Sequence, residues 1–333
     1  MILLVGAGAV GTILAAHIAA GRREPLRIYA RAKDLPGMSA APALRVDTVS
    51  AAQPLLVADK PQLTDSLDLA GVDYLFICVK YSGLQKLLDE LPVIPPSCTL
   101  VSTLNGIAPL RLIRQRLPQA RVLPMTIMYN GQLLGPLHAQ ITTKPIVVAS
   151  GDDARLLGCF GGSGMKVQRA SGDAAVWGKL LINLANAIGA ITHTTFKDLF
   201  THPDLRAVYV TVLDEAVGLL ERAGIPYKLP MPIPYPVYRW MLLNGGPVPW
   251  WIAKIKNGLR EGSYASMVAD VDQGRQTEVA QLNGEVARLG TEKNIPTPVS
   301  DRIVELVEKM AGKAPPSYLS PGELEQQLSL AKA

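Results

Sequence analysis

The chain has 333 residues, of which 48% are hydrophobic and 18% charged, and its formal net charge is +5. This length supports a large buried core and predicts two domains. No run of Lys and Arg with interleaved aromatic residues occurs, so the composition argues against nucleic-acid binding, while the mild positive charge suits small anionic ligands.

The first predicted element is a strand that runs into a glycine-rich turn. The chain opens MILLVGAGAVGTILAAHIAAG, in which residues 2–5 are continuously apolar, as in a strand buried on both faces of a parallel sheet. A signal peptide would carry basic residues before its apolar run, but here the first are Arg22 and Arg23. A membrane span fits poorly, because glycines and His17 interrupt the stretch.

The turn has the pattern G-x-G-x-x-G and is made of Gly6, Ala7, Gly8, Ala9, Val10 and Gly11. In a dinucleotide site the first glycine permits the tight turn, the second lets backbone approach the pyrophosphate, and the third lets helix and strand pack closely. A helix is predicted from Val10 to about Ala20, and its N-terminus would face the phosphates. The alternative is a structural turn without a ligand.

The second strand is predicted at 26–30 and is followed by Arg31. An NAD site would place Asp or Glu there for the ribose 2′-hydroxyl, whereas a guanidinium can bind a 2′-phosphate. Arg31 therefore favours NADP(H) as cofactor. A solvated arginine at the end of a strand is the alternative.

Further strand-like runs lie near Leu55 and at 74–80, 99–104, 121–128 and 145–150, with helical stretches between several of them. This alternation predicts an α/β fold with an open, mainly parallel, doubly wound sheet of the Rossmann type. Lys80 and Asn105 follow two of the strands, where ligands bind in such sheets. Each of them also fits an ordinary loop, since Asn105-Gly106 is a common turn.

After Ser171 the pattern becomes helical, which predicts a nucleotide-binding domain at 1–170 and an all-α substrate and catalytic domain at 171–333. In chain order, helices are expected at 174–191, 204–224, about 265–290 and 299–311. A last helix is expected from Ser320, where Ser-Pro-Gly-Glu forms a capping pattern. The segment 227–262 is rich in proline and aromatic residues. It predicts a rigid loop that packs on the surface, contacts a second copy of the chain, or covers the substrate.

The first of these helices carries Lys179, Asn183 and Asn186 on one stripe among Leu, Ile and Ala. If the stripe faced water, its polar residues would indicate no function. The apolar residues around it favour a stripe that faces an interdomain cleft. A partly desolvated lysine there could donate a proton near neutral pH. On the helix expected at 265–290, Ser266 and Glu278 lie beside apolar positions. Glu278 could pair with a buried lysine or, alternatively, with Arg275 nearby.

The remaining reactive side chains are scattered. Three distant cysteines (Cys78, Cys98 and Cys159) form no disulfide framework, and the four histidines form no pair at metal-ligand spacing. These features predict a cytoplasmic protein without a metal site, not bound to a membrane.

These motifs together resemble the ketopantoate reductase (2-dehydropantoate 2-reductase) family over most of the chain. The matching pieces are GAGAVG at 6–11, Arg31, VK at 79–80, NG at 105–106, W-x-K-L-x-x-N at 177–183, SM…D…GR-x-TE…LNG at 266–284 and IPTP at 295–298. The resemblance implies an NADPH-dependent reductase with a Rossmann domain and a helical domain similar to the C-terminal domain of 6-phosphogluconate dehydrogenase.

The resemblance also implies roles for the residues. Lys179 would donate a proton to the ketone oxygen, and Glu278 would lie near this lysine, the substrate and the cofactor. Asn183 and Ser266 would hold the substrate, and Lys80 and Asn105 would lie near the nicotinamide and the substrate. Asn186, on the same stripe as Lys179 and Asn183, is a further candidate for binding the substrate.

Two departures from the family pattern concern the substrate. Ala187 stands where the family usually has a second asparagine, so that Asn186 is the nearest amide, and Ala280 replaces an acid. The sequence therefore predicts reduction of ketopantoate in pantothenate synthesis, with two alternatives. These are reduction of another 2-oxo acid and a catalytically silent NADP(H)-binding protein.

Overall fold

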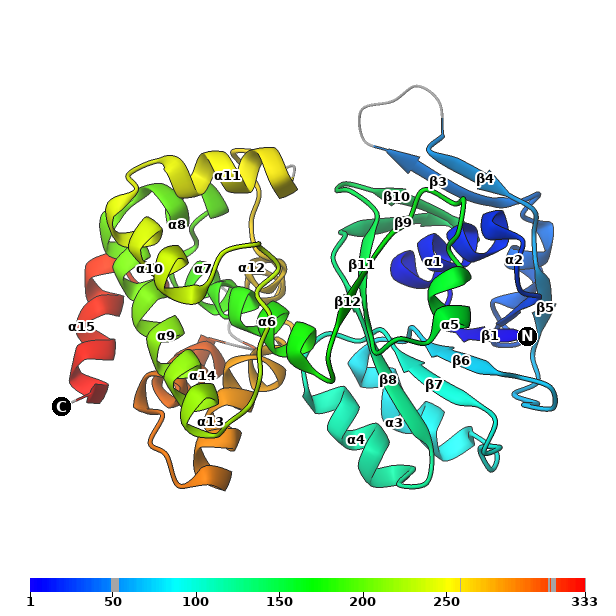
Figure 1. The fold of residues 1–333 in the computed structure, drawn as a ribbon. Coiled ribbons are helices and arrows are strands. Elements are labelled where there is room, and N and C mark those ends of the chain that lie inside the picture. Colours follow the sequence, from blue (N-terminus) through cyan, green and yellow to red (C-terminus); the bar gives the residue numbers. More distant parts are fainter. Residues whose placement is uncertain (49–53, 258, 311, 313–315, 333) are drawn as a thin grey trace. The chain divides into compact units, whose positions relative to one another are not determined.

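The computed structural model describes residues 1–48, 54–257, 259–310, 312 and 316–332. The chain divides into two compact units, Met1–Ala175 and Val176–Ala333 (Figure 1). The first is an α/β unit and the second is helical, as the sequence predicts.

The α/β unit is built on an eight-stranded sheet in the order β12-β11-β8-β7-β6-β1-β2-β5. Its strands are β1 (Ile2–Val5), β2 (Leu26–Tyr29), β5 (Gln62–Thr64), β6 (Tyr74–Ile77), β7 (Thr99–Ser102), β8 (Arg121–Ile127), β11 (Ile146–Ser150) and β12 (Lys166–Ala170). The first six are mutually parallel, and β11 runs antiparallel to β8. The doubly wound sheet predicted from the sequence is confirmed.

A second sheet, of four strands, covers the helix that follows β1. Its order is β4-β3-β10-β9, with β3 (Leu44–Thr48), β4 (Leu56–Ala58), β9 (Gly131–Gly135) and β10 (His138–Ile141). The run near Leu55, expected in the main sheet, instead forms β4 and pairs with β3. Helix α1 (Ala9–Gly21) contacts all four of these strands as well as β1 and β2 (Figure 1).

The position of α1 between two sheets explains why the opening stretch is apolar on every side. Residues 11–18 of α1 are all buried, including Thr12 and His17. A helix that is hydrophobic all round is one that packs on more than one face. The membrane-like composition of the opening thus reflects burial inside this unit.

Four more helices belong to the α/β unit: α2 (Leu35–Ala40), α3 (Tyr81–Glu90), α4 (Ala108–Arg116) and α5 (Ala154–Gly158). Leu84, Leu87 and Leu88 of α3, with Ile113 of α4, form one core with residues of β1, β6 and β7. This core is separate from the one that surrounds α1.

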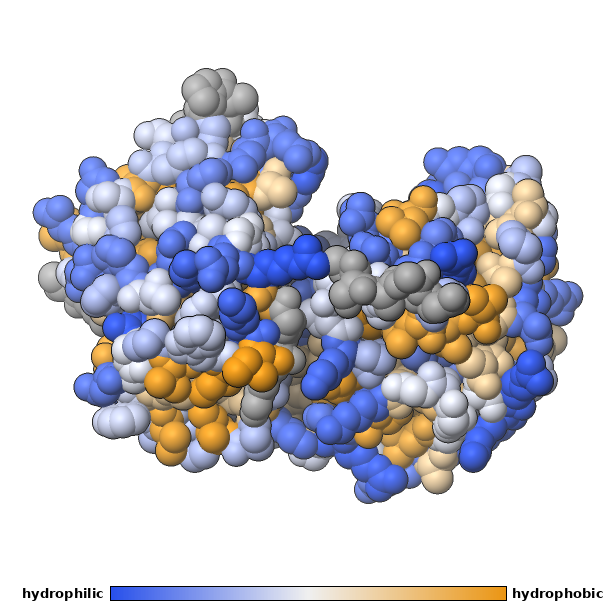
Figure 2. All heavy atoms as spheres, turned by 90° about the horizontal axis from the view of Figure 1, so that it is seen from above, coloured by the Kyte–Doolittle hydropathy of each residue, from blue (hydrophilic) through white to orange (hydrophobic). Residues whose placement is uncertain are grey.

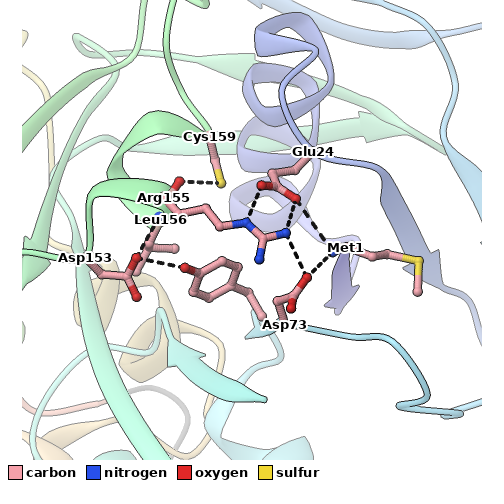
Figure 3. Close-up of polar contacts among 8 residues, drawn as sticks. Met1, Glu24, Asp73, Asp153, Arg155, Leu156 and Cys159 are labelled. Carbon is pink, nitrogen blue, oxygen red and sulfur yellow. Dashed lines mark hydrogen bonds and ion pairs between the residues drawn. The ribbon is translucent and has the colours of Figure 1, made fainter. Parts of the chain in front are cut away.

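A network of charges lies at the end of β1 opposite the glycine turn (Figure 3). Arg155 of α5 donates two hydrogen bonds to the carboxylate of Glu24, at 2.5 and 2.7 Å, and one to Asp73 at 2.9 Å. The amino group of Met1 bonds to Asp73. Arg155 lowers the pKa of Glu24, and the Met1 ammonium, followed by Arg155, lowers that of Asp73.

The second unit contains α6 (Ala174–Asn183), α7 (Ala185–Thr192), α8 (Phe196–Thr201), α9 (Pro203–Arg222), α10 (Tyr235–Asn244), α11 (Val248–Asn257), α12 (Ser266–Asp272), a 3-10 turn (Val279–Gln281), α13 (Asn283–Lys293), α14 (Pro298–Met310) and α15 (Pro321–Lys332). The carboxylate of Glu215 on α9 accepts hydrogen bonds from the N–H groups of Val299 and Ser300 at the start of α14. The predicted capping pattern at Ser320 is present, with Ser320 and Glu323 bonded reciprocally.

The helix predicted at 174–191 is interrupted at Leu184. The N–H of Leu184 is shared between the carbonyls of Leu180 and Leu181, which tightens the turn there. Counted as one stretch, Ala174–Thr192 is long and apolar enough to cross a membrane by length and composition, with a mean hydropathy of 1.4. In this fold 78% of that window is buried inside the protein.

The prediction of a single helix at 265–290 is wrong. Helix α12 ends at Asp272, and Gly274 follows with a φ of +63°. The N–H of Gly274 bonds to Val271 and that of Arg275 to Asp270, which is the Schellman arrangement that terminates helices. Ser266 and Glu278 therefore lie on different elements.

The prediction of a loop at 227–262 is also wrong, because much of this segment forms α10 and α11. Pro236 and Pro249 each stand in the first turn of a helix, where a proline costs no hydrogen bond. Tyr235, Tyr238 and Trp250 are buried, whereas Trp240 and Trp251 are exposed. Figure 2 shows hydrophobic side chains among hydrophilic ones on the surface of the helical unit.

Candidate active site

The glycine turn is held against the end of β6. Gly6 has a φ of +101°, and a Cβ added to it would lie 2.6 Å from the carbonyl carbon of Cys78. A Cβ on Gly11 would lie 2.0 Å from the carbonyl oxygen of Gly6. Both residues must therefore be glycine for the strand, turn and helix to pack as they do.

Gly8 has no such structural reason to be glycine. Its φ and ψ of −75° and −167° suit any residue, and no atom lies within 4 Å of an added Cβ. It is exposed and precedes the first turn of α1, whose N–H groups it cannot cap with a side chain. The open space next to the Cα of Gly8 leaves room for a pyrophosphate, and the N–H groups of the first turn of α1 could donate hydrogen bonds to it, as the dinucleotide motif requires.

The neighbouring residues of the turn complete this surface. Ala7, Ala9 and Val10 are partly exposed. The hydroxyl of Tyr129, which follows β8 and is buried, donates a hydrogen bond to the Val10 carbonyl at 3.1 Å. This contact ties the first turn of α1 to the sheet, and nothing in the local sequence indicated it.

The other candidates of this unit lie along the same edge of the sheet. Lys80 follows β6 at the N-cap position of α3, where its side chain makes no capping bond, and Asn105 precedes Gly106 after β7; both are exposed. Because β2, β1, β6 and β7 are adjacent and parallel, Arg31, the glycine turn, Lys80 and Asn105 all follow the carboxyl ends of neighbouring strands. Arg31 is exposed, and its Nε donates to Asp34 at 2.7 Å.

Helices α6 and α7 carry the polar stripe, and its three residues are among the few positions of 174–192 that are not buried. Within these residues, all of which the structure describes, Lys179, Ile182, Asn183 and Asn186 are partly exposed and every other position is buried. Ala187 is fully buried. Asn186, and not residue 187, therefore shares the partial exposure of Lys179, as the spacing of seven residues on a helix predicts.

Lys179 has an unusual environment for a lysine. Burial lowers its pKa to about 8, and the charge of Glu278 opposes this shift. Gly178, its neighbour, packs against the backbone of Lys228, because an added Cβ would lie 1.8 Å from that carbonyl oxygen. The close approach holds this turn of α6 in place.

Glu278 and Ser266 are both exposed, at the start of the 3-10 turn and at the start of α12. The guanidinium of Arg275 donates to Asp270 at 2.7 and 3.0 Å. Glu278 is one of the charges that set the pKa of Lys179. A lysine with a pKa near 8 can hold a proton at neutral pH and also release it, which suits a general acid.

These features define a class of protein. A parallel sheet with a glycine turn cleared for a pyrophosphate, joined to a helical unit that carries a lysine of lowered pKa, is the architecture of a dinucleotide-dependent oxidoreductase.

Comparison with known proteins names the family. Residues 2–152 match the family described as ketopantoate reductase PanE/ApbA, and residues 173–311 match its C-terminal domain. The chain belongs to the ketopantoate reductase family, a family of NAD(P)-dependent oxidoreductases.

Individual relatives are distant in sequence. The 2-dehydropantoate 2-reductase of Mesorhizobium japonicum is 26% identical over 93% of this chain and 97% of its own length. A PanE/ApbA family ketopantoate reductase from Ralstonia eutropha has a similar fold, with a TM-score of 0.73 and 23% identity over 93% of this chain and 98% of that one. D-mandelate dehydrogenase, solved with NADH and anilino(oxo)acetate, has a TM-score of 0.71 at 17% identity over 93% and 98% of the two chains.

Proposed function

We propose that this protein reduces the ketone of a 2-oxo acid with NADPH, and that ketopantoate is its substrate. The observation that carries the proposal is Lys179, a lysine of lowered pKa on a stripe with two amides, in a chain of this family. The named relative from Mesorhizobium japonicum supports ketopantoate as the substrate.

The glycine turn, Arg31 and Lys80 would hold NADPH, which would supply the hydride for C2 of the substrate. The ammonium of Lys179 hydrogen-bonds to the ketone oxygen and gives it a proton as negative charge develops there. The negative charge of Glu278 keeps more of Lys179 protonated, because it raises a pKa that burial alone would lower further. Lys179 and Glu278 are thus the proposed catalytic pair.

The remaining candidates bind the substrate and the cofactor. Asn183 and Asn186 have amides that can both donate to a carboxylate and accept from a hydroxyl, and the partly exposed Ile182, next to Asn183 in the chain, offers an apolar contact. Ser266 and Asn105 are proposed to hold the other polar groups of the substrate.

NADPH is proposed because Arg31 follows β2 where an NAD site would have an acid. The glycine turn, with Lys80, binds the rest of the cofactor. The structure of D-mandelate dehydrogenase contains NADH, so the preference of the present chain must be measured.

The test is oxidation of NADPH, followed by its absorbance, with ketopantoate and a panel of other 2-oxo acids that includes aromatic ones. We expect the highest kcat/KM with ketopantoate. A higher kcat/KM with an aromatic 2-oxo acid would overturn ketopantoate as the substrate but would leave the proposed reductase activity in place. Tight NADPH binding without turnover of any substrate would favour the silent cofactor-binding protein instead.

A further inference from the structure

Arg31, which binds the 2′-phosphate of NADPH in the proposed function, forms an ion pair with Asp34. The Nε of Arg31 donates to Oδ2 of Asp34 at 2.7 Å, and the N–H of Asp34 bonds to the carbonyl of Arg31 at 2.8 Å. Both side chains are solvent-accessible, 65% and 40% exposed. The pair lies in the turn directly after β2.

This turn is where the adenosine ribose of a dinucleotide lies in a Rossmann-type sheet. A guanidinium there binds a 2′-phosphate through two parallel hydrogen bonds, while a carboxylate accepts one from a 2′-hydroxyl and repels a phosphate. The present chain offers both groups within one turn, and the carboxylate occupies the Nε edge of the guanidinium.

We propose that Asp34 is a specificity-determining residue that reduces the preference of this protein for NADPH over NADH. Its carboxylate competes with the 2′-phosphate for Arg31 and opposes the phosphate charge. The ion pair is exposed and therefore weak, so Arg31 exchanges readily between the two partners. The same carboxylate accepts a hydrogen bond from the 2′-hydroxyl of NADH.

This inference rests on the proposed NAD(P)-binding function, and binding without catalysis tests it. Dissociation constants of NADPH, NADH, adenosine 2′,5′-bisphosphate and AMP are measured by calorimetry for the wild-type protein and for Asp34→Asn. Asp34 makes no side-chain capping bond to α2, so the variant should fold normally. We expect Asp34→Asn to bind NADPH and the bisphosphate roughly 3- to 10-fold more tightly, with no gain for NADH or AMP.

The control is Asp59→Asn, which removes the same charge from another exposed pair, Arg22–Asp59, in the same unit. We expect it to leave all four constants unchanged. An equal gain in this control, or no change in Asp34→Asn, would overturn the role of Asp34 alone. If the wild-type protein bound none of the four nucleotides, the dinucleotide site itself would be refuted, and Asp34 with it.

Discussion

Glu278 raises the pKa of Lys179 against a larger, opposite effect of burial, and the balance is a pKa of about 8. Since the protonated lysine is the proposed proton donor, kcat/KM for ketone reduction should be constant at lower pH and fall about tenfold per pH unit above about 8. Steady-state rates between pH 6 and 10 would show this limb.

Replacing Glu278 with Gln removes the charge that favours the ammonium. The descending limb should then move to lower pH, because desolvation of Lys179 is no longer opposed. A limb that stays in place or moves to higher pH would contradict the coupling between these two residues.

Lys179→Met should remove the proton donor and retain most of the packing of the side chain. We expect kcat to fall by about 10²- to 10⁴-fold, the usual contribution of a general acid. The NADPH dissociation constant, measured by fluorescence, should stay within about threefold, because general acid catalysis acts after the cofactor binds. Lys197→Met is the matched control, since Lys197 is a lysine of the same unit that pairs with Glu261 at 2.9 Å. Full activity in Lys179→Met would remove Lys179 from the mechanism.

Two glycines of the same turn should respond differently to alanine. Gly11→Ala places a Cβ against a carbonyl oxygen and should cost about 2–3 kcal/mol of stability or more. Gly8→Ala meets no atom within 4 Å and should cost less than about 1 kcal/mol. It should nevertheless weaken NADPH binding more than about tenfold, because the methyl group enters the space assigned to the pyrophosphate. Urea unfolding and cofactor titration separate the two effects, and unchanged affinity in a folded Gly8→Ala protein would argue against this site.

The charge network around Arg155 should make the α/β unit sensitive to acid. The pKa values of Glu24 and Asp73 are lowered in the folded state, so their ionised forms stabilise the fold above the ordinary carboxyl pKa values. That contribution is lost as the pH falls from about 4.5 through the lowered values.

Arg155→Gln should therefore cost about 1 kcal/mol near pH 7, a modest amount because Arg155 is half exposed. The difference from the wild type should shrink as the pH is lowered from 5 towards 3. Thermal unfolding across this range measures it, and a difference that persists unchanged at pH 3 would show that Arg155 acts by packing alone.

The sequence predicted those parts of the structure that local patterns determine. The strand at 2–5, the glycine turn and the polar stripe through Lys179 each show in a run of fewer than twenty residues. The second sheet was not predicted, because its strands are short and pair across long separations. The ring of His138 on β10, for example, bonds to Asp47 on β3, 91 residues earlier.

Helix ends were predicted where the side chains that form them are visible in the sequence. Ser320 and Glu323 indicated the cap that they form, and the helix predicted at 204–224 ends close to Gly224, which has a positive φ. Gly274 does the same within 265–290, but the apolar periodicity around it indicated one continuous helix. The cap that Glu215 provides to α14 joins residues 84 and 85 positions apart, and local patterns cannot show it.

Helix α1 packs against strands of both sheets, so its N-terminus, where we propose that the phosphates bind, is held in place by the whole unit. In this proposed site a nucleotide would meet backbone amides that are already oriented, so the protein would lose little conformational entropy when the nucleotide binds. The same packing makes the proposed nucleotide site depend on the small sheet as well as on the main one.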